Sequence, residues 1–285
     1  MLASVTELLR CIRCDHPGPL SLEAGGKRKG EQVMEGALTC LGCGARWPIE
    51  DGIADFVGGE DAGAGLAQRL MEAAPIPMIY ERYWRPALMR MVQPPRAFEE
   101  EARVVVRMLR PQIGDNVADV ACGTGNYTRR WARLVAHGPK AEGGMAVGFD
   151  RSAVMLRQAA RQARAENLDN VSFIRADVHR LPLRTASWDG AACCAALHLF
   201  SNPGQVIAEI GAALKPGGRF ACLTLEEREG DWGRWIAQGS ELLTGLHFFA
   251  REELENLTTR ARLEWIEAVR HGQVCIFVAR ASRTA

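Results

Sequence analysis

The stretch of residues 117–150 constrains the fold of this chain more than any other. A short apolar run leads into the sequence DVACGTG (residues 119–125), a helical stretch follows, and a second apolar run ends at Asp150. This order of strand, glycine turn, helix, strand and acid is typical of a nucleotide-type site at the carboxyl end of a parallel sheet. Glycine lets the backbone approach a ligand where a Cβ atom would collide. The acid can accept hydrogen bonds from both hydroxyls of a ribose.

The glycine spacing argues against two common phosphate-binding sites. The dinucleotide fingerprint requires a third glycine three residues after Gly125, and Thr128 stands there. A phosphate-binding P-loop requires the sequence GK followed by Ser or Thr, which does not follow these glycines. An NAD-dependent enzyme is therefore an alternative that the missing glycine disfavours.

The sequence DVACGTG resembles motif I of the class I S-adenosylmethionine-dependent methyltransferases. The resemblance implies that the loop with Gly123 and Gly125 faces the methionine part of the cofactor, and that Asp150 binds its ribose. Asp119 matches the acid that braces the loop. Ala121 stands where the family often has glycine.

Three later segments match the same family in the same order. The sequence ADV (residues 176–178) follows an apolar run, WDG (188–190) precedes another, and LKPGGRFACLTL (214–225) ends the series. The resemblance implies that Asp177 binds the adenine amino group and that Val178 packs on the ring. The expected cofactor site comprises Asp119, Ala121, Cys122, Gly123, Gly125, Asp150, Arg151, Asp177, Val178 and Ala195.

The pattern of apolar residues predicts an α/β fold with a Rossmann-like, seven-stranded methyltransferase sheet and helices on both faces. We expect strands at 117–121, 145–149, 171–175 and 188–194, and a fifth strand within 214–225. Helices are expected at 98–109, at 127–135, and after Ser152 as N-cap. The hairpin-like segment 261–281 would close the sheet with an antiparallel strand.

Two C-x-x-C pairs near the N-terminus, Cys11/Cys14 and Cys40/Cys43, predict a tetrahedral four-thiolate zinc site. A segment this short buries little core by itself, so a metal would add stability. A redox dithiol or metal-free cysteines are the alternatives. The glycine-rich residues 25–30 are expected to form a hairpin tip. The sequence from 38 to 56 resembles the zinc ribbons that act as small activator subunits of translation-related methyltransferases, which implies a structural metal.

The composition favours a cytoplasmic globular protein. The formal net charge is +1, with 47% hydrophobic and 24% charged residues. Five further cysteines lie in or beside expected strands, and buried thiols favour a reducing compartment. No apolar run approaches the roughly 20 residues that span a bilayer, and a secretory signal is not expected.

The chain divides into a zinc ribbon (1–58), a linker and helical lid (59–95) and a methyltransferase domain (96–285). The middle segment is rich in tyrosine and proline. It forms either a linker helix packed on the main domain or a cover over the active site. In the second case the candidates for substrate contact are Tyr80, Tyr83, Trp84 and Arg85.

His198 is the best candidate for a catalytic base, because it lies just beyond the fourth expected strand and an imidazole suits proton transfer. The alternative is a histidine that only shapes its loop. His247, Glu226 and Glu227 are weaker candidates. The N-P-P-[YF] motif of exocyclic amine methylation is absent after that strand, where the sequence is CAAL.

The whole arrangement resembles plant-plastid and bacterial methyltransferases with a zinc ribbon, a YERYWR segment (80–85) and ALH (196–198). The core also resembles the quinone-biosynthesis C-methyltransferases. Both imply methyl transfer to carbon or oxygen of a small organic molecule, quinone-like or polyketide-like. One alternative is an rRNA or tRNA base methyltransferase, but six Lys or Arg against eight Asp or Glu in residues 1–58 disfavour RNA binding. Another is a non-catalytic binding module. A homodimer is possible.

Overall fold

The computed structural model describes residues 1–14, 16–23, 25–58, 98–137, 142–227 and 246–282. The whole of the expected linker and lid (59–95), including Tyr80, Tyr83, Trp84 and Arg85, lies outside these residues. Within the described part of the chain, no helix is long and apolar enough to cross a membrane.

The core of the molecule is a sheet of seven strands in the order β11-β10-β7-β12-β13-β15-β14. The first five strands are parallel, β15 is antiparallel to β13, and β14 forms a hairpin with β15. The strands are β7 (Asn116–Val120), β10 (Met145–Asp150), β11 (Val171–Arg175), β12 (Trp188–Cys194), β13 (Leu214–Leu225), β14 (Leu263–His271) and β15 (Val274–Ala281). The predicted seven strands and the antiparallel closure are confirmed.

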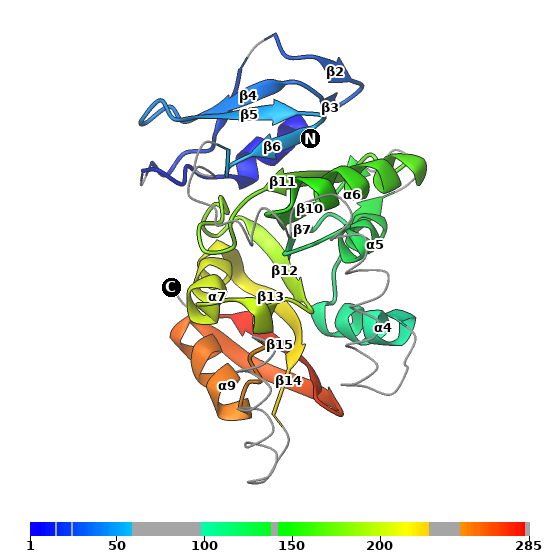
Figure 1. Cartoon of the computed structure of the whole chain (residues 1–285), viewed down its shortest axis with the longest axis vertical. Coiled ribbons are helices and arrows are strands. Elements are labelled where there is room, and N and C mark those ends of the chain that lie inside the picture. The colour runs from blue at the N-terminus through cyan, green and yellow to red at the C-terminus, as the bar shows by residue number, and fades with distance from the viewer. Residues whose placement is uncertain (15, 24, 59–97, 138–141, 228–245, 283–285) are drawn as a thin grey trace.

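Helices cover both faces of this sheet, as predicted (Figure 1). One face carries α4 (Phe98–Leu109), α5 (Asn126–Val135) and α6 (Ala153–Ala165), which bury Met108, Trp131 and Leu156 in one hydrophobic cluster. The other face carries α7 (Pro203–Ala213) and α9 (Arg251–Arg260), which bury Ile207 and Leu254 in a second cluster.

Local sequence signals explain where several elements begin and end. Ser152 caps α6, because its hydroxyl accepts a hydrogen bond from Met155 N at 3.4 Å, as the sequence predicts. Asn202 caps α7 through Gln205 N at 3.2 Å, and proline follows at the first helical position. The segment 214–225 is one long strand, β13, with Pro216 and Gly217 inside it.

The N-terminal segment begins with a 3-10 helix, η1 (Ala3–Leu8), which is followed along the chain by a small ribbon of short strands. Its strands are β1 (Ser21–Leu22), β2 (Arg28–Lys29), β3 (Gln32–Val33), β4 (Gly36–Thr39), β5 (Arg46–Glu50) and β6 (Ile53–Asp55). The hairpin tip expected at 25–30 is shifted. Arg28 and Lys29 pair with Val33 and Gln32, so the turn falls at Gly30 and Glu31. A second two-stranded pair, β8 (Ala136–His137) and β9 (Glu142–Gly143), lies after α5.

The ribbon and the core share one sheet. Strand β6 pairs in parallel with β11, with Ile53 opposite Phe173 and Asp55 opposite Arg175, which extends the sheet to 11 strands. The ribbon also buries Leu9, Trp47 and other side chains in the same cluster as α7 and α9. The ribbon therefore does not depend on its own small core, and the domain boundaries stay a prediction.

Candidate functional site

The candidate cofactor residues gather at one edge of the sheet. Strands β7, β10, β11 and β12 run parallel, so their carboxyl ends meet at the same edge. The glycine loop follows β7, Asp150 ends β10, Asp177 follows β11, and Ala195 follows β12. The structure thus brings together residues that lie up to 76 positions apart in the sequence.

The carboxylate of Asp150 holds the glycine loop against the next turn. Its Oδ2 atom accepts a hydrogen bond from Gly123 N at 2.8 Å, and its Oδ1 atom accepts one from Ser152 N at 2.8 Å. Burial raises the pKa of Asp150, while these backbone donors oppose that shift. The loop itself has left-handed backbone at Ala121 (φ 56°) and Gly123 (φ 55°).

The packing around Gly125 leaves no room for a side chain. Its φ is +72°, and a Cβ atom there would lie 2.9 Å from Phe173 Cε1 and 3.0 Å from Ala159 Cβ. Gly148 on β10, which the sequence analysis did not single out, is similar. A Cβ atom there would lie 2.7 Å from the Cys122 sulfur. Both glycines let α5 and α6 pack close to the sheet, and the contact of Gly125 with a cofactor stays a prediction.

Thr128 stands where the dinucleotide fingerprint has its third glycine, and its side chain forms a hydrogen bond inside the protein. Its hydroxyl donates a hydrogen bond to Asp119 Oδ2 at 2.5 Å, and both residues are buried. Burial raises the pKa of Asp119 to about 7, and the charge of Asp150 adds to the shift. The bond between Asp119 and Thr128 therefore joins β7 to the first turn of α5, across the glycine loop.

Asp177 is held by two neighbours. Its Oδ2 atom accepts from Arg151 Nη1 at 2.7 Å, and its Oδ1 atom accepts from His179 N at 2.9 Å and lies 3.1 Å from His179 Nδ1. Burial opposes the shift, but the bonds from His179 and the charge of Arg151 lower the pKa of Asp177. Arg151 and Asp177, two of the expected cofactor residues, are thus in direct contact in the structure. His179 carried no sequence signal beyond its place beside Asp177.

The remaining expected positions also lie at this edge. Val178 packs against the core cluster on the α7 face. Ala195 has left-handed backbone (φ 59°), and its N–H donates to Leu223 O at 2.8 Å.

His198 lies on the 3-10 helix η4 (Leu197–Leu199), just after β12, and is 8% exposed. Its Nδ1 atom lies 3.5 Å from the hydroxyl oxygen of the buried Thr224, which stands on β13. Its carbonyl accepts from His247 N at 2.9 Å. The next residue in the chain, Leu199, is 48% exposed.

Two weaker candidates have other contacts. Glu226 is 3% exposed and accepts two hydrogen bonds from the Arg251 guanidinium, at 2.9 and 3.0 Å. His247 Nε2 lies 3.1 Å from Glu253 Oε1. The paired charge of Glu226 indicates a structural tie between β13 and α9 rather than a base.

The four N-terminal cysteines converge, with all four sulfur atoms within 4.8 Å of one another. The sulfurs of Cys11 and Cys43 are 3.7 Å apart, and those of Cys14 and Cys40 are 3.6 Å apart. A tetrahedron with Zn–S bonds of about 2.3 Å has sulfur–sulfur edges of about 3.8 Å. These spacings suit a four-thiolate metal site. A metal held by four cysteines would have no open position for substrate.

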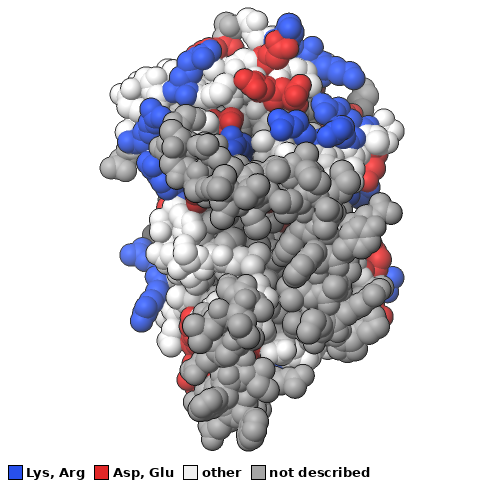
Figure 2. Space-filling model, viewed as in Figure 1, with Lys and Arg blue, Asp and Glu red and all other residues white. Residues whose placement is uncertain are grey.

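The surface around the ribbon carries mixed charge. On the face in Figure 2, Lys and Arg of the upper part stand among Asp and Glu. Arg46 pairs with Glu23, and Lys27 pairs with Glu35. Such interspersed charges do not form the one-sign surface that an RNA phosphate backbone favours.

Comparisons with known proteins point to the same family as the motifs. Residues 117–218 match a family model described as "Methyltransferase domain". An uncharacterized chloroplastic methyltransferase of Arabidopsis thaliana is 27% identical over 96% of this chain and 78% of its own length. A demethylmenaquinone methyltransferase of Listeria welshimeri is 32% identical over 41% of this chain and 48% of its own length.

The solved structure of the [4+2]-cyclase SpnF has the same fold. Its TM-score is 0.55 at 22% identity, over 65% of this chain and 80% of the SpnF chain. This likeness concerns the fold alone, which can carry different reactions. Together the sequence similarities support an S-adenosylmethionine-dependent methyltransferase.

Proposed function

We propose that this protein transfers a methyl group from S-adenosylmethionine to carbon or oxygen of a small, quinone-like or polyketide-like molecule. The observation that carries the proposal is the bond from Gly123 N to Asp150 Oδ2 at 2.8 Å. It joins the glycine loop to the acid that ends the second strand, at the carboxyl edge of a sheet with methyltransferase topology.

Each cofactor residue has a role in this proposal. Asp150 keeps lone pairs for the ribose hydroxyls after its two backbone bonds. Asp177 accepts from the adenine amino group, with Arg151 and His179 fixing its orientation. The loop at residues 121–125 lies against the methionine part. Cys122, Val178 and Ala195 line the space between these groups.

The cofactor supplies a methyl group already activated by its positive sulfur. The chain must therefore align the acceptor and exclude water. His198 accepts the proton that a carbon or oxygen acceptor loses. Thr224, at 3.5 Å from His198 Nδ1, orients the imidazole so that Nε2 can take that proton.

The proposed acceptor class rests on the similarity to a demethylmenaquinone methyltransferase and on the exposed apolar residue that follows His198 in the chain. Leu199, the next residue in the chain, is 48% exposed, and Phe200 follows it. A flat aromatic acceptor would bury this apolar surface. The four cysteines bind zinc as a structural metal remote from methyl transfer.

The test is methyl transfer from labelled S-adenosylmethionine by the full chain. Naphthoquinols and phenolic polyketides serve as acceptors, beside total RNA. Label in a quinol or polyketide product supports the proposal. Label in RNA alone would overturn the acceptor class, and calorimetry without S-adenosylmethionine binding would overturn the enzyme assignment.

A further inference from the structure

The ribbon forms hydrogen bonds with the loop that follows Asp177. Arg10, next to the first cysteine, donates its backbone N–H to Pro182 O and its Nε–H to Leu183 O, both at 2.9 Å. Its Nη2 atom pairs with Glu209 on α7 at 2.6 Å. One ribbon residue thus binds the loop and the helix beside it.

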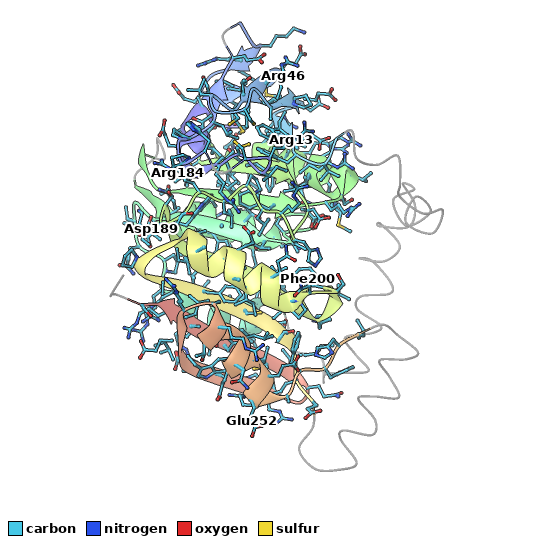
Figure 3. The ribbon with its side chains drawn as sticks, turned by 90° about the vertical axis from the view of Figure 1, so that its left-hand side faces the viewer. Arg13, Arg46, Arg184, Asp189, Phe200 and Glu252 are labelled. Atoms are coloured by element: carbon cyan, nitrogen blue, oxygen red, sulfur yellow. The ribbon has the colours of Figure 1, made fainter. Side chains whose placement is uncertain are left out.

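Two arginines of the core also donate hydrogen bonds to the backbone of the ribbon. Arg184 donates its backbone N–H to Leu8 O at 2.9 Å, and Arg180 donates from Nη2 to Ile12 O at 2.9 Å. Ile12 lies between the two cysteines of the first pair. The turn that carries Cys11 and Cys14 is therefore hydrogen-bonded directly to Arg180, in the loop at residues 180–184. Figure 3 shows Arg184 where the ribbon meets the core.

A second tie reaches the turn after Asp150. Asp55 ends the ribbon strand β6, and its Oδ2 atom accepts from Arg175 Nη1 at 3.0 Å. Arg175 also donates from Nε to Arg151 O at 2.9 Å. The Arg175 side chain is 14% exposed, so solvent screens this ion pair little. Asp55 thus fixes the backbone between the ribose acid and Ser152.

We infer that the ribbon is a positioning element for the adenosine half of the cofactor site, acting through Arg10 on the Asp177 loop and through Asp55 on the Asp150 turn. The inference rests on the proposed function, because it concerns the affinity for S-adenosylmethionine. Neither Arg10 nor Asp55 is an expected cofactor contact. Both act on backbone that carries the contacts, so their loss should raise the dissociation constant without removing a ligand to the cofactor.

The test compares Arg10→Ala and Asp55→Asn with a matched ribbon control, Arg46→Ala. Arg46 forms two bonds to Glu23 within the ribbon, at 2.7 and 2.9 Å, and lies in its upper part (Figure 3). Calorimetry of the full chain measures the S-adenosylmethionine Kd. We expect Kd to rise about 5- to 30-fold in Arg10→Ala and about 3- to 10-fold in Asp55→Asn, with Arg46→Ala unchanged. Hydrogen exchange should accelerate in residues 176–184 for Arg10→Ala.

A second measurement removes the metal from the wild-type chain with a chelator, under conditions where circular dichroism shows the sheet intact. The Kd should rise as in Arg10→Ala, and added zinc should restore it. Equal Kd values in all variants, with the wild type binding S-adenosylmethionine, would overturn the inference alone. Wild-type protein that binds no S-adenosylmethionine overturns the proposed function instead.

Discussion

Thr128 donates its hydroxyl hydrogen bond to Asp119 across 2.5 Å, at the position where a dinucleotide-binding loop has its third glycine. The glycine would allow a helix to approach a strand closely. Here the side chain at that position instead binds a buried carboxyl group on β7. Where the dinucleotide pattern has glycine, this chain therefore has a side chain that forms a hydrogen bond between β7 and α5.

This buried carboxyl group should give the free energy of unfolding a specific pH dependence. Burial raises the pKa of Asp119 from its ordinary value of 3.8 to about 7. Between about pH 4 and 7 the folded chain holds a proton that the unfolded chain has lost, so stability falls as pH rises. The slope from this group approaches about 1.4 kcal/mol per pH unit. Asp119→Asn should lose that slope in denaturant titrations, whereas Asp169→Asn, at an exposed position, should keep it.

Asp150 should govern cofactor affinity more than stability. Asp150→Ala removes the acceptor for the ribose hydroxyls, and hydrogen bonds to a charged group contribute about 1.5–3 kcal/mol. We expect the Kd for S-adenosylmethionine to rise about 10- to 150-fold in calorimetry. The loss of the bonds to Gly123 and Ser152 should lower the melting temperature by only a few degrees. Unchanged affinity would remove Asp150 from the ribose site.

Much of the core fold is encoded locally and could be predicted. The helix at 98–109 and the strands at 171–175 and 188–194 have the predicted bounds. The helix has apolar residues at helical spacing, and the two strands are short, mostly apolar runs. The glycine loop and the acids follow from strand ends, which meet at one edge in any parallel sheet.

The joining of ribbon and core could not be predicted in the same way. Ile53 pairs with Phe173 across 120 residues, and no local pattern specifies such a partner. Arg10 likewise gains its bonds to Leu183 and Glu209, 173 and 199 positions away, only from tertiary packing. Gly148 resembles any small residue in a buried strand until the Cys122 sulfur and Phe173 are placed around it.

Gly125 should be sensitive to substitution even without cofactor. Gly125→Ala combines left-handed backbone with a Cβ atom 2.9 Å from Phe173 Cε1. We expect a loss of about 2–5 kcal/mol in the free energy of unfolding. Gly30→Ala is the matched control, because Gly30 also has positive φ but has no atom within 4 Å of a new Cβ. It should lose only about 1–2 kcal/mol. Equal losses in both variants would contradict the packing explanation.

The cysteine cluster should hold one metal ion per chain. Native mass spectrometry of the full chain should show one zinc, and Cys14→Ser should reduce its occupancy because a thiolate ligand is lost. Cys194→Ser, on β12 and outside the cluster, should keep the metal. The melting temperature should fall with Cys14→Ser and with chelation of the wild type, but not with chelation of a metal-free variant. A wild-type chain purified in reducing buffer with zinc and found without metal would refute the site.

His198 should affect turnover and not cofactor binding. His198→Asn removes the group proposed to take the proton, and general-base catalysis contributes about 10²- to 10⁴-fold. We expect kcat with a quinol or phenolic acceptor to fall by that range, while the S-adenosylmethionine Kd stays within about twofold of the wild-type value. Thr224→Val deletes only the hydroxyl 3.5 Å from His198 Nδ1, so kcat should fall by a smaller factor. If His198→Asn keeps the wild-type kcat across pH 6–9, the imidazole only shapes the loop between β12 and α7.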